Sequence, residues 1–203
     1  GDMRVIIPGL AFLSLMAAPA LAQSDSGPQP TCTMCEGVYV PAAEIAAYSK
    51  KAVAEHRIDQ QVRDIDIGKA HVALGVEHRG KLDKNGPQAV AEHDQVSEVY
   101  HIIDGSATLK VGPRLVNKKR RPADEETVRL YNGPGNNSDD IEGGVSYDLK
   151  PGDVIFIPAG TGHLFSHIDD HIDYIMVRID PDKITPLKDE AASKVTLGDY
   201  YKK

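Results

Sequence analysis

The sequence predicts an all-β fold, either a sandwich or a barrel. From residue 59 onward, apolar residues recur with a period of two in many short segments. Turns rich in Gly and Pro separate these segments. Only one stretch, residues 41–55, has the pattern of a helix. Many short strands accompanied by a single helix are typical of a sandwich or a barrel.

The composition is that of a globular protein of about one domain. The chain has 203 residues, of which 41% are hydrophobic, so it can bury a core. The net charge of −7 and the pI of about 5.6 argue against nucleic acid or an anionic membrane surface as a partner. The basic run 118–121 is followed by acidic residues at 124–126, which predicts a solvated loop that balances its own charge.

Residues 1–22 have the pattern of a secretory signal peptide. A minimal basic start at 3–4 precedes an apolar run, 5–18, that is too short to span a bilayer comfortably. The small-x-small pattern at 20–22 is typical of a cleavage site. Residues 1–2 are interpreted as a cloning remnant. The mature protein is therefore expected to be periplasmic or secreted, with no membrane contact after cleavage.

Residues 23–58 are expected to form an N-terminal arm that contains a CxxC motif and the helix. An exported protein favours a disulfide for Cys32 and Cys35, either with each other or with a partner. A thioredoxin-like pair would need a βαβ context, which is not visible, and a structural zinc site would need two more ligands nearby. We favour a structural disulfide, with a link to a partner or to a metal as the alternative.

The helix is expected to run from Pro41 to about Glu55. Pro is well placed in a first turn, and alanines dominate the segment. Ile45, Tyr48 and Ala52 share one face of such a helix, which is the face expected to pack on the barrel.

The barrel is predicted to span residues 59–182, and the tail 183–203 to pack along its outside. Turns are expected where Gly, Pro, Asn and Asp gather. They are expected at 80–86, 150–153 and 158–162, with a long loop at 132–144. Strands are expected at 59–67, 71–79, 93–105 (as strand, turn, strand), 107–111, 127–131, 145–149, 154–157, 163–168 and 172–180.

Metal-ligating residue types gather on one face of two of these segments. Because alternate residues of a strand share a face, Glu98 and Tyr100 point one way and His101 points outward. His93 lies far enough before Glu98 for a turn to bring it round, and His163 starts a later strand. A carboxylate and two imidazoles from different strands are the ligand set that holds a divalent first-row metal with open positions.

The spacing within both segments carries a family resemblance. Glu98 is followed after six residues by Gly105. The later segment has the pattern G-x5-P-x-G-x2-H, formed by Gly152, Pro158, Gly160 and His163. Over residues 70–180 the sequence resembles the cupin superfamily, as a small single-domain exported cupin of an uncharacterised type. The resemblance implies a jelly-roll β-barrel with one N-terminal helix, and dimerisation is a habit of that family.

One histidine of the usual cupin ligand set is missing. If His93 is the second histidine of the first motif, the first position holds Ala91. If His93 is the first, the second position holds Gln95. Tyr100 has the spacing seen in some cupin lyases that act on dimethylsulfoniopropionate, where the tyrosine ligates the metal or serves as a base. Alternatively Gln95 approaches the metal, or His167 does so from the position of the usual Asn.

These patterns predict a cofactor and two alternative functions. The cofactor is a divalent transition metal, with Zn, Fe, Mn, Ni and Cu all compatible. Two imidazoles and a carboxylate without Cys argue against a purely structural zinc site. We expect an enzyme of the lyase, isomerase or dioxygenase type acting on a small polar organic molecule, with Tyr100 or Glu98 moving a proton. For this role the metal would have to lower the pKa of Tyr100. The alternative is a non-catalytic module that stores or senses a metal or a small ligand.

Other charged residues on the strands are given structural roles. Arg79 and Arg178 are expected to form salt bridges on the outer face. If one of them faced the lumen instead, it could bind a substrate carboxylate. Phe165 shares the face of His163 and would give the pocket an apolar wall. The remaining histidines have no recognisable partner and are expected to be surface or structural residues: His56, His71, His78 and His171.

Overall fold

The computed structural model describes residues 27–83 and 89–202. The chain divides into two units, residues 1–30 and 31–203, and only the last few residues of the first are described. The predicted signal peptide therefore lies outside the described residues. Within the described ranges, no helix combines the length and the apolar character needed to cross a membrane. The following description concerns the second unit.

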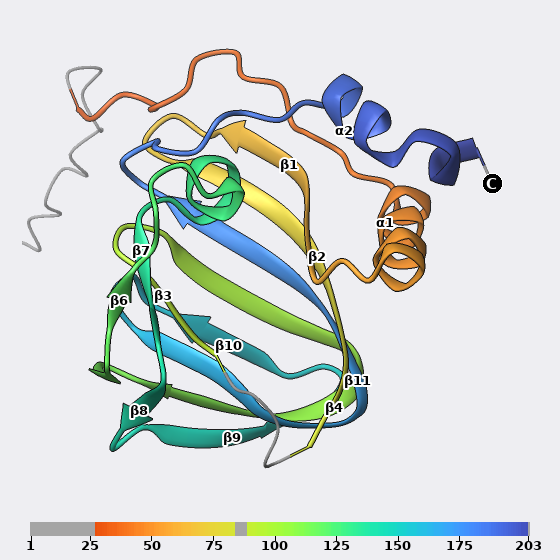
Figure 1. Cartoon of the computed structure of the whole chain (residues 1–203). Helices are drawn as coiled ribbons and strands as arrows, with labels where there is room; N and C mark the ends of the chain where they lie inside the picture. Colours follow the sequence, from red (N-terminus) through yellow and green to blue (C-terminus); the bar gives the residue numbers. More distant parts are fainter. Residues whose placement is uncertain (1–26, 84–88, 203) are drawn as a thin grey trace, which may run out of the picture. The chain divides into compact units, whose positions relative to one another are not determined.

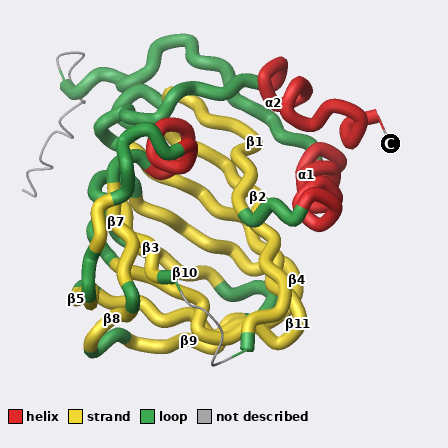
Figure 2. Tube along the Cα trace, in the orientation of Figure 1, coloured by secondary structure: helices red, strands yellow, loops and turns green. Residues whose placement is uncertain are grey.

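Strands are the main regular structure of this unit, as expected for an all-β fold. The two α-helices occur before the first strand and after the last one, and one helical turn, η1 (Val128–Asn132), lies between the strands (Figures 1 and 2). In chain order the elements are α1 (Ala42–Glu55), β1 (Asp59–Asp66), β2 (His71–Leu82), β3 (Val90–His93), β4 (Ser97–Gly112), β5 (Arg114–Val116), β6 (Lys119–Arg120), the π-helical turn η1 (Val128–Asn132), β7 (Gly135–Ser138), β8 (Asp140–Glu142), β9 (Val145–Leu149), β10 (Val154–Ile157), β11 (Gly162–Asp180), α2 (Glu190–Leu197) and the 3-10 turn η2 (Gly198–Lys202).

Two long strands, β4 and β11, run through both layers of the barrel. Residues 171–180 of β11 lie between β2 and the first half of β4, which gives one layer the order β1-β2-β11-β4-β10. Residues 162–168 of β11 pair with the second half of β4 and with β3, which gives the other layer the order β6-β7-β3-β11-β4-β9. Every pair is antiparallel, and Figure 1 shows the long strands curving from one layer into the other. This is the expected jelly-roll barrel.

Both long strands bend at the corner between the layers. The register of β11 shifts between Ile168 and His171 against β2 and between Ile168 and Ile172 against β4, and β4 reaches its corner at Gly105. Gly105 has φ +77°, and a Cβ there would lie 2.0 Å from the carbonyl oxygen of His171. Only glycine permits this approach. The sequence predicted two separate strands on each side of these corners, whereas the structure has one bent strand, because bulges turn a strand without ending it.

Two predicted segments between residues 127 and 144 are wrong. Residues 127–131, predicted as a strand, form most of η1. Residues 132–144, predicted as a loop, contain β7 and β8, which pair with β3, β6 and β5. The sequence GNNS of β7 has no intrinsic preference for a strand, so its pairing depends on neighbours far along the chain. Its Asn and Gly residues are typical of turns, so its local sequence does not indicate the backbone hydrogen bonds that pair it with β3.

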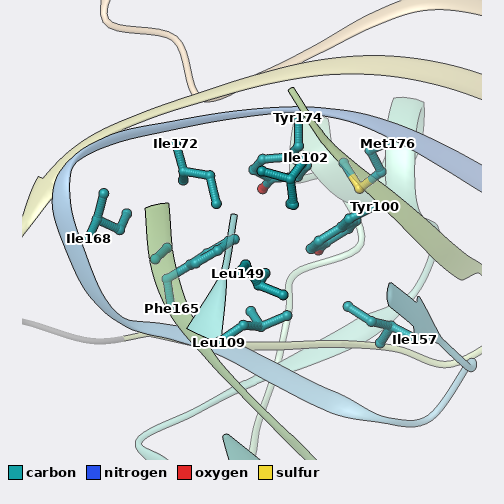
Figure 3. Packing of buried hydrophobic residues seen from close by; sticks show 11 residues of the cluster. Tyr100, Ile102, Leu109, Leu149, Ile157, Phe165, Ile168, Ile172, Tyr174 and Met176 are labelled. Carbon is teal, nitrogen blue, oxygen red and sulfur yellow. The ribbon is translucent and has the colours of Figure 1, made fainter. Parts of the chain in front are cut away.

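The core of the barrel is an apolar cluster enclosed by the two layers. Its aromatic rings lie close together, with 4.6 Å between the ring centroids of Tyr100 and Tyr174. Figure 3 shows these side chains gathered in the space that the strands enclose. The buried members are Tyr100, Ile102, Ala107, Leu109, Leu149, Ile157, Phe165, Ile168, Ile172, Tyr174 and Met176.

The helices pack at the β1–β2 end of the first layer. Tyr48 of α1 is fully buried in a second apolar cluster that includes Val62 of β1 and Leu197 of α2. The helix α1 agrees with the predicted helix, whereas α2 was not predicted. A sequence signal for α2 exists, because the side chain of Asp189 caps its first turn by accepting from the backbone N–H of Ala192 at 2.8 Å.

The two cysteines of the N-terminal arm are bonded to each other. Cys32 and Cys35 form a disulfide, which is the pairing that the sequence favoured. Their segment precedes α1 and is outside the barrel strands.

Candidate metal centre

Three of the predicted ligands converge at the mouth of the barrel. His93 is the last residue of β3, Glu98 is the second residue of β4, and His163 is the second residue of β11. The backbone of Gly160 donates to the carbonyl of His93 at 2.7 Å, which ties the turn before β11 to the end of β3. All three side chains are buried, and their ligand atoms lie within 4.8 Å of one another.

The distances within this cluster suit a shared metal ion. Nε2 of His93 lies 3.3 Å from Oε1 of Glu98, and Nε2 of His163 lies 3.3 Å from Oε2. Ligands bound at about 2.0–2.2 Å to one tetrahedral ion are separated by roughly 3.3–3.5 Å. Two imidazole nitrogens and a carboxylate are also the donor types that a divalent transition metal prefers.

The second ring nitrogens of the two histidines have different partners. Nδ1 of His163 lies 3.2 Å from the carbonyl of Thr161. It therefore carries the proton, and the lone pair of Nε2 is free for a metal. Nδ1 of His93 lies 3.3 Å from Nη1 of Arg121. Because a guanidinium only donates, Nδ1 of His93 accepts and its proton sits on Nε2, facing Glu98. His93 can ligate a metal only after this contact breaks.

The electrostatics keep Glu98 ionised and His163 neutral. Burial alone would raise the pKa of Glu98, but His93, His163 and Arg178 outweigh burial and hold that pKa well below its usual range. Burial lowers the pKa of His163 to about 4, against the opposing attraction of Glu98. A carboxylate and a neutral imidazole are the protonation states in which these groups bind metals.

Tyr100 lies beside the cluster as a proton donor. Its hydroxyl donates to Oε2 of Glu98 at 2.8 Å. Burial, followed by the negative charge of Glu98, raises the pKa of Tyr100 well above its usual value. The sequence-based role of Tyr100 as a base needs a lowered pKa, and its surroundings act in the opposite direction.

Gln95 and His167, the two alternative ligands, are not part of this cluster. The amide of Gln95 donates to Asp182 at 3.0 Å. A register shift between Phe165 and His167 breaks the alternation on which the prediction for His167 relied. Nε2 of His167 lies 3.0 Å from Asp169, away from Glu98. Ala91, one of the two positions at which the resemblance places the missing histidine, lines the cavity and pairs with His163.

The cluster opens into a polar cavity of about 250 Å³. Arg178 lines this cavity and is 1% exposed, with Nε 3.6 Å from Glu98 and a further ion pair to Asp59. The predicted outer-face salt bridge is wrong for Arg178, because the even-numbered residues in this half of β11 face the interior. It is also wrong for Arg79, which lines the same cavity and donates from Nε to the hydroxyl of Tyr174 at 3.1 Å. His101 is exposed, as predicted.

Arg121 is a site residue that its sequence pattern did not indicate. It belongs to the basic run that was interpreted as a solvated loop, yet it is 8% exposed. Its guanidinium contacts Asn137 at 2.8 Å and the carbonyl of Asn136 at 3.2 Å in addition to His93. The backbone N–H of Arg121 donates to Gly135 in β7. The pairing of β6 with β7 brings this residue over the mouth, and no local signal in the sequence marks it.

Comparison with known proteins gives one family match. The family description "AraC-like ligand binding domain" matches residues 137–195, which include β9, β10 and β11 with His163. No curated protein matches the sequence.

Several solved structures are similar to this chain at low identity. A protein from Bacillus halodurans is 12% identical with a TM-score of 0.40, covering 84% of this chain and 98% of its own. A cupin protein from Bacteroides fragilis is 11% identical with a TM-score of 0.31, covering 58% and 72%. A predicted oxalate decarboxylase from Thermotoga maritima is 17% identical with a TM-score of 0.30, covering 64% and 73%.

The matched segment contributes the second half of the barrel and the histidine that faces Glu98. It forms part of an antiparallel barrel in which β4 and β11 connect two layers. The match over residues 137–195 and the antiparallel jelly-roll barrel agree with the cupin-type fold that the sequence resemblance implies, and the matched segment is similar to a ligand-binding domain of the AraC-like type.

Proposed function

We propose that this protein is a metal-dependent cupin enzyme that acts on a small organic molecule carrying a carboxylate. The observation that carries the proposal is the convergence of His93, Glu98 and His163 on one wall of the cavity at the barrel mouth, which is lined mainly by polar and charged residues. A divalent metal held by these residues would supply Lewis acidity toward a carbonyl or carboxylate oxygen. Lyase, isomerase and dioxygenase chemistry are all compatible with such a site.

Arg79 supports a carboxylate as the feature that the cavity recognises. Arg178 has Asp59 and Glu98 as acidic partners, and the guanidinium of Arg121 is bound to Asn137, Asn136 and His93. Arg79, by contrast, has no ion pair within 4 Å among the described residues, and its one hydrogen bond there is to Tyr174. A guanidinium with unused N–H groups in a cavity is suited to bind a carboxylate through two parallel hydrogen bonds.

The ring of Phe165 holds Arg79 in place. The guanidinium carbon of Arg79 lies 5.0 Å from the centroid of that ring. Stacking on an aromatic face orients the guanidinium and adds to its attraction. Phe165 therefore contributes to the pocket by positioning a cation, in addition to the apolar wall that its sequence position predicts.

Tyr100 is the group best placed to donate a proton. Its hydroxyl stays protonated because burial and Glu98 raise its pKa. The side chain lines the cavity between Glu98 and Tyr174. A proton held at this oxygen can be transferred to a substrate oxygen or carbon that reaches hydrogen-bond distance.

A non-catalytic ligand-binding or sensing module is the second candidate. The match to a ligand-binding domain favours it. The contact of Arg121 with Nδ1 of His93 also favours it, because this contact opposes metal binding by His93. In that function the cavity would bind a small anion through Arg79 and carry out no chemistry.

Metal analysis of the purified full-length chain tests the pocket site. We expect His93→Ala and His163→Ala each to hold one metal equivalent less than the wild type, whereas His101→Ala, an exposed histidine on β4, keeps the wild-type content. Unchanged metal content in both pocket variants would contradict the proposal. The visible spectrum of the Co²⁺-loaded protein, minus that of the Co²⁺-loaded His163→Ala variant, then separates the two functions. A change on adding azide indicates an open coordination position and favours an enzyme, and no change favours a binding module.

Export and dimerisation remain proposals. If residues 1–22 are a signal peptide, the protein recovered from the periplasm will begin at Gln23, which intact mass spectrometry will show. Light scattering of that protein measures whether it is the dimer expected from the resemblance.

A further inference from the structure

A second group of metal-ligating side chains lies outside the barrel mouth. It consists of Asp104 of β4 together with His171 and Asp173 of β11, and their ligand atoms all lie within 4.8 Å of one another. None of the three lines the cavity described above. We propose that these residues form a separate binding site for a divalent transition metal, with Zn²⁺ as the natural probe. This inference does not depend on the proposed function.

The strand register places these residues in one row on the outer face. Asp173 pairs with Asp104 on one side and with His78 of β2 on the other. Its neighbours Ile172 and Tyr174 are fully buried, so the side chain of Asp173 points outward. His171 precedes Asp173 by two residues and shares that face. Three adjacent strands thus present ligand types at the same level of the sheet.

The corner of the barrel brings Asp104 next to His171. Gly105 approaches the carbonyl of His171 so closely that no side chain fits between them. Asp104 immediately precedes this glycine, so its carboxylate lies beside the imidazole of His171. The glycine of the first cupin motif therefore also shapes a site on the outer surface.

The two ring nitrogens of His171 are arranged as in known metal-binding histidines. Nδ1 lies 2.8 Å from Oδ2 of Asp170, and Nε2 lies 3.4 Å from Oδ2 of Asp104. Asp170 accepts the Nδ1 proton and leaves the Nε2 lone pair facing Asp104, which is the carboxylate–histidine–metal arrangement. The distance of 3.4 Å is long for a hydrogen bond but matches the roughly 3.3–3.5 Å between two ligands of one tetrahedral ion.

His78 orients the third ligand. Its Nδ1 lies 2.6 Å from Oδ1 of Asp173, and its ring stacks on that of His171 with 6.1 Å between centroids and 24° between planes. The other oxygen of Asp173 remains available for a metal. His78 is thus a positioning residue in this site, comparable to Asp170. His78 and His171 were expected to be surface or structural residues, and the structure gives them the partners Asp173 and Asp170, which the sequence did not indicate.

The donor set and the exposure define what would bind. One imidazole nitrogen and two carboxylate oxygens suit Zn²⁺ and the other divalent first-row ions, with water completing the coordination. The side chain of His171 is 31% exposed and that of Asp104 is 68% exposed, so an ion can reach the site from solvent. The same residues without a metal would be an ion-pair cluster, which is the alternative that the experiment must separate.

The test measures Zn²⁺ stoichiometry and affinity by calorimetric titration of the full chain after chelator treatment. The His163→Ala background removes the barrel-mouth site and leaves the outer site alone. In that background we expect one equivalent of Zn²⁺ to bind. Adding Asp104→Asn or His171→Ala should abolish this binding, and Asp170→Asn should weaken it about 10-fold, as loss of such a partner usually does. Adding His101→Ala, an exposed histidine on the same strand as Asp104, should change nothing.

Two results would overturn the proposal. One is no Zn²⁺ binding in the His163→Ala background, which would leave only an ion-pair cluster. The other is undiminished binding after Asp104→Asn, which would place the metal elsewhere. Asp104 is exposed, so its variant should fold, and circular dichroism checks this. A different result would show that only the barrel-mouth site is absent. The wild type would then bind a single Zn²⁺, Asp104→Asn would abolish that binding, and His163→Ala would leave it unchanged.

Discussion

The two clusters use similar side chains in opposite surroundings. In the barrel mouth, His93, Glu98 and His163 are 4%, 2% and 6% exposed, whereas Asp104 of the outer cluster is 68% exposed. Both clusters take ligands from β4 and β11, but on opposite faces of the sheet. The strands on which the ligands lie therefore do not determine how well each cluster binds a metal. The exposure and the neighbouring side chains of each ligand determine it.

The histidine partners differ most clearly between the clusters. Nδ1 of His171 faces the carboxylate of Asp170, which strengthens Nε2 as a ligand. Nδ1 of His93 faces the cation Arg121, which weakens it. The inner cluster is also part of a buried ion-pair network through Glu98 and Arg178. The inner cluster therefore contributes to the stability of the fold, and the Arg121 contact weakens it as a metal site. The outer cluster contributes little to the stability of the fold, and Asp170 strengthens it as a metal site.

The largest expected difference is in stability without metal. Glu98→Gln removes a buried charge and leaves Arg178 short of an acidic partner, so we expect a loss of about 3 kcal/mol of unfolding free energy. Asp104→Asn changes an exposed group, so we expect a change within about 0.5 kcal/mol. Urea denaturation in the presence of a chelator measures both. Equal losses in the two variants would contradict the comparison.

The pH dependence of stability should have opposite signs for the two clusters. The pKa of His163 is lowered from 6.5 to about 4, so the unfolded chain binds more protons between these values. The contribution of His163 is complete above pH 6.5 and is lost on acidification toward pH 4. The pKa of His171 is raised, by Asp170 first and then by Asp104. Its contribution is present below pH 6.5 and is lost as pH rises through the raised pKa.

Denaturation of the metal-free protein from pH 4.5 to 8.5 measures these slopes. His163→Asn should flatten the acidic side of the stability profile, and His171→Asn the side above pH 6.5. The assigned pKa directions are wrong if His163→Asn keeps the wild-type slope of stability against pH below pH 6.5 and His171→Asn keeps it above pH 6.5.

Arg121→Gln should make the inner cluster resemble the outer one. A glutamine carbonyl can accept the Nδ1 proton of His93, which frees Nε2 for a metal. We expect Zn²⁺ affinity at the barrel mouth to rise about 10-fold, the usual scale for such partners. Arg120→Gln, which changes an exposed arginine paired with Asp94, is the matched control and should leave affinity unchanged. A weaker Zn²⁺ affinity in Arg121→Gln would mean that Arg121 assists the metal site.

The smallest effects are expected at the two alternative ligands. Gln95→Ala and His167→Ala change side chains that contact Asp182 and Asp169 and lie outside both clusters. Zn²⁺ affinity should stay within about twofold of the wild type, since such substitutions alter free energies by about 0.5 kcal/mol or less. Loss of one metal equivalent in either variant would return that residue to the ligand set.

The sequence by itself determined the features that depend on local backbone geometry. The period of two placed Glu98 and Tyr100 inside the barrel and His101 outside, and the motif spacing indicated the cupin barrel. The strands 145–149 and 154–157 agree with β9 and β10 for the same reason.

The tertiary structure alone decided the features that depend on contacts between distant segments. Bulges in β11 moved His167 away from Glu98 and brought His171 beside Asp104, and periodicity cannot foresee a bulge. Arg178 and Arg121 read as surface cations because arginines are usually exposed. They are buried here because acids and amides from strands far along the chain surround them. A buried charge depends on such partners, and only the folded chain brings them together.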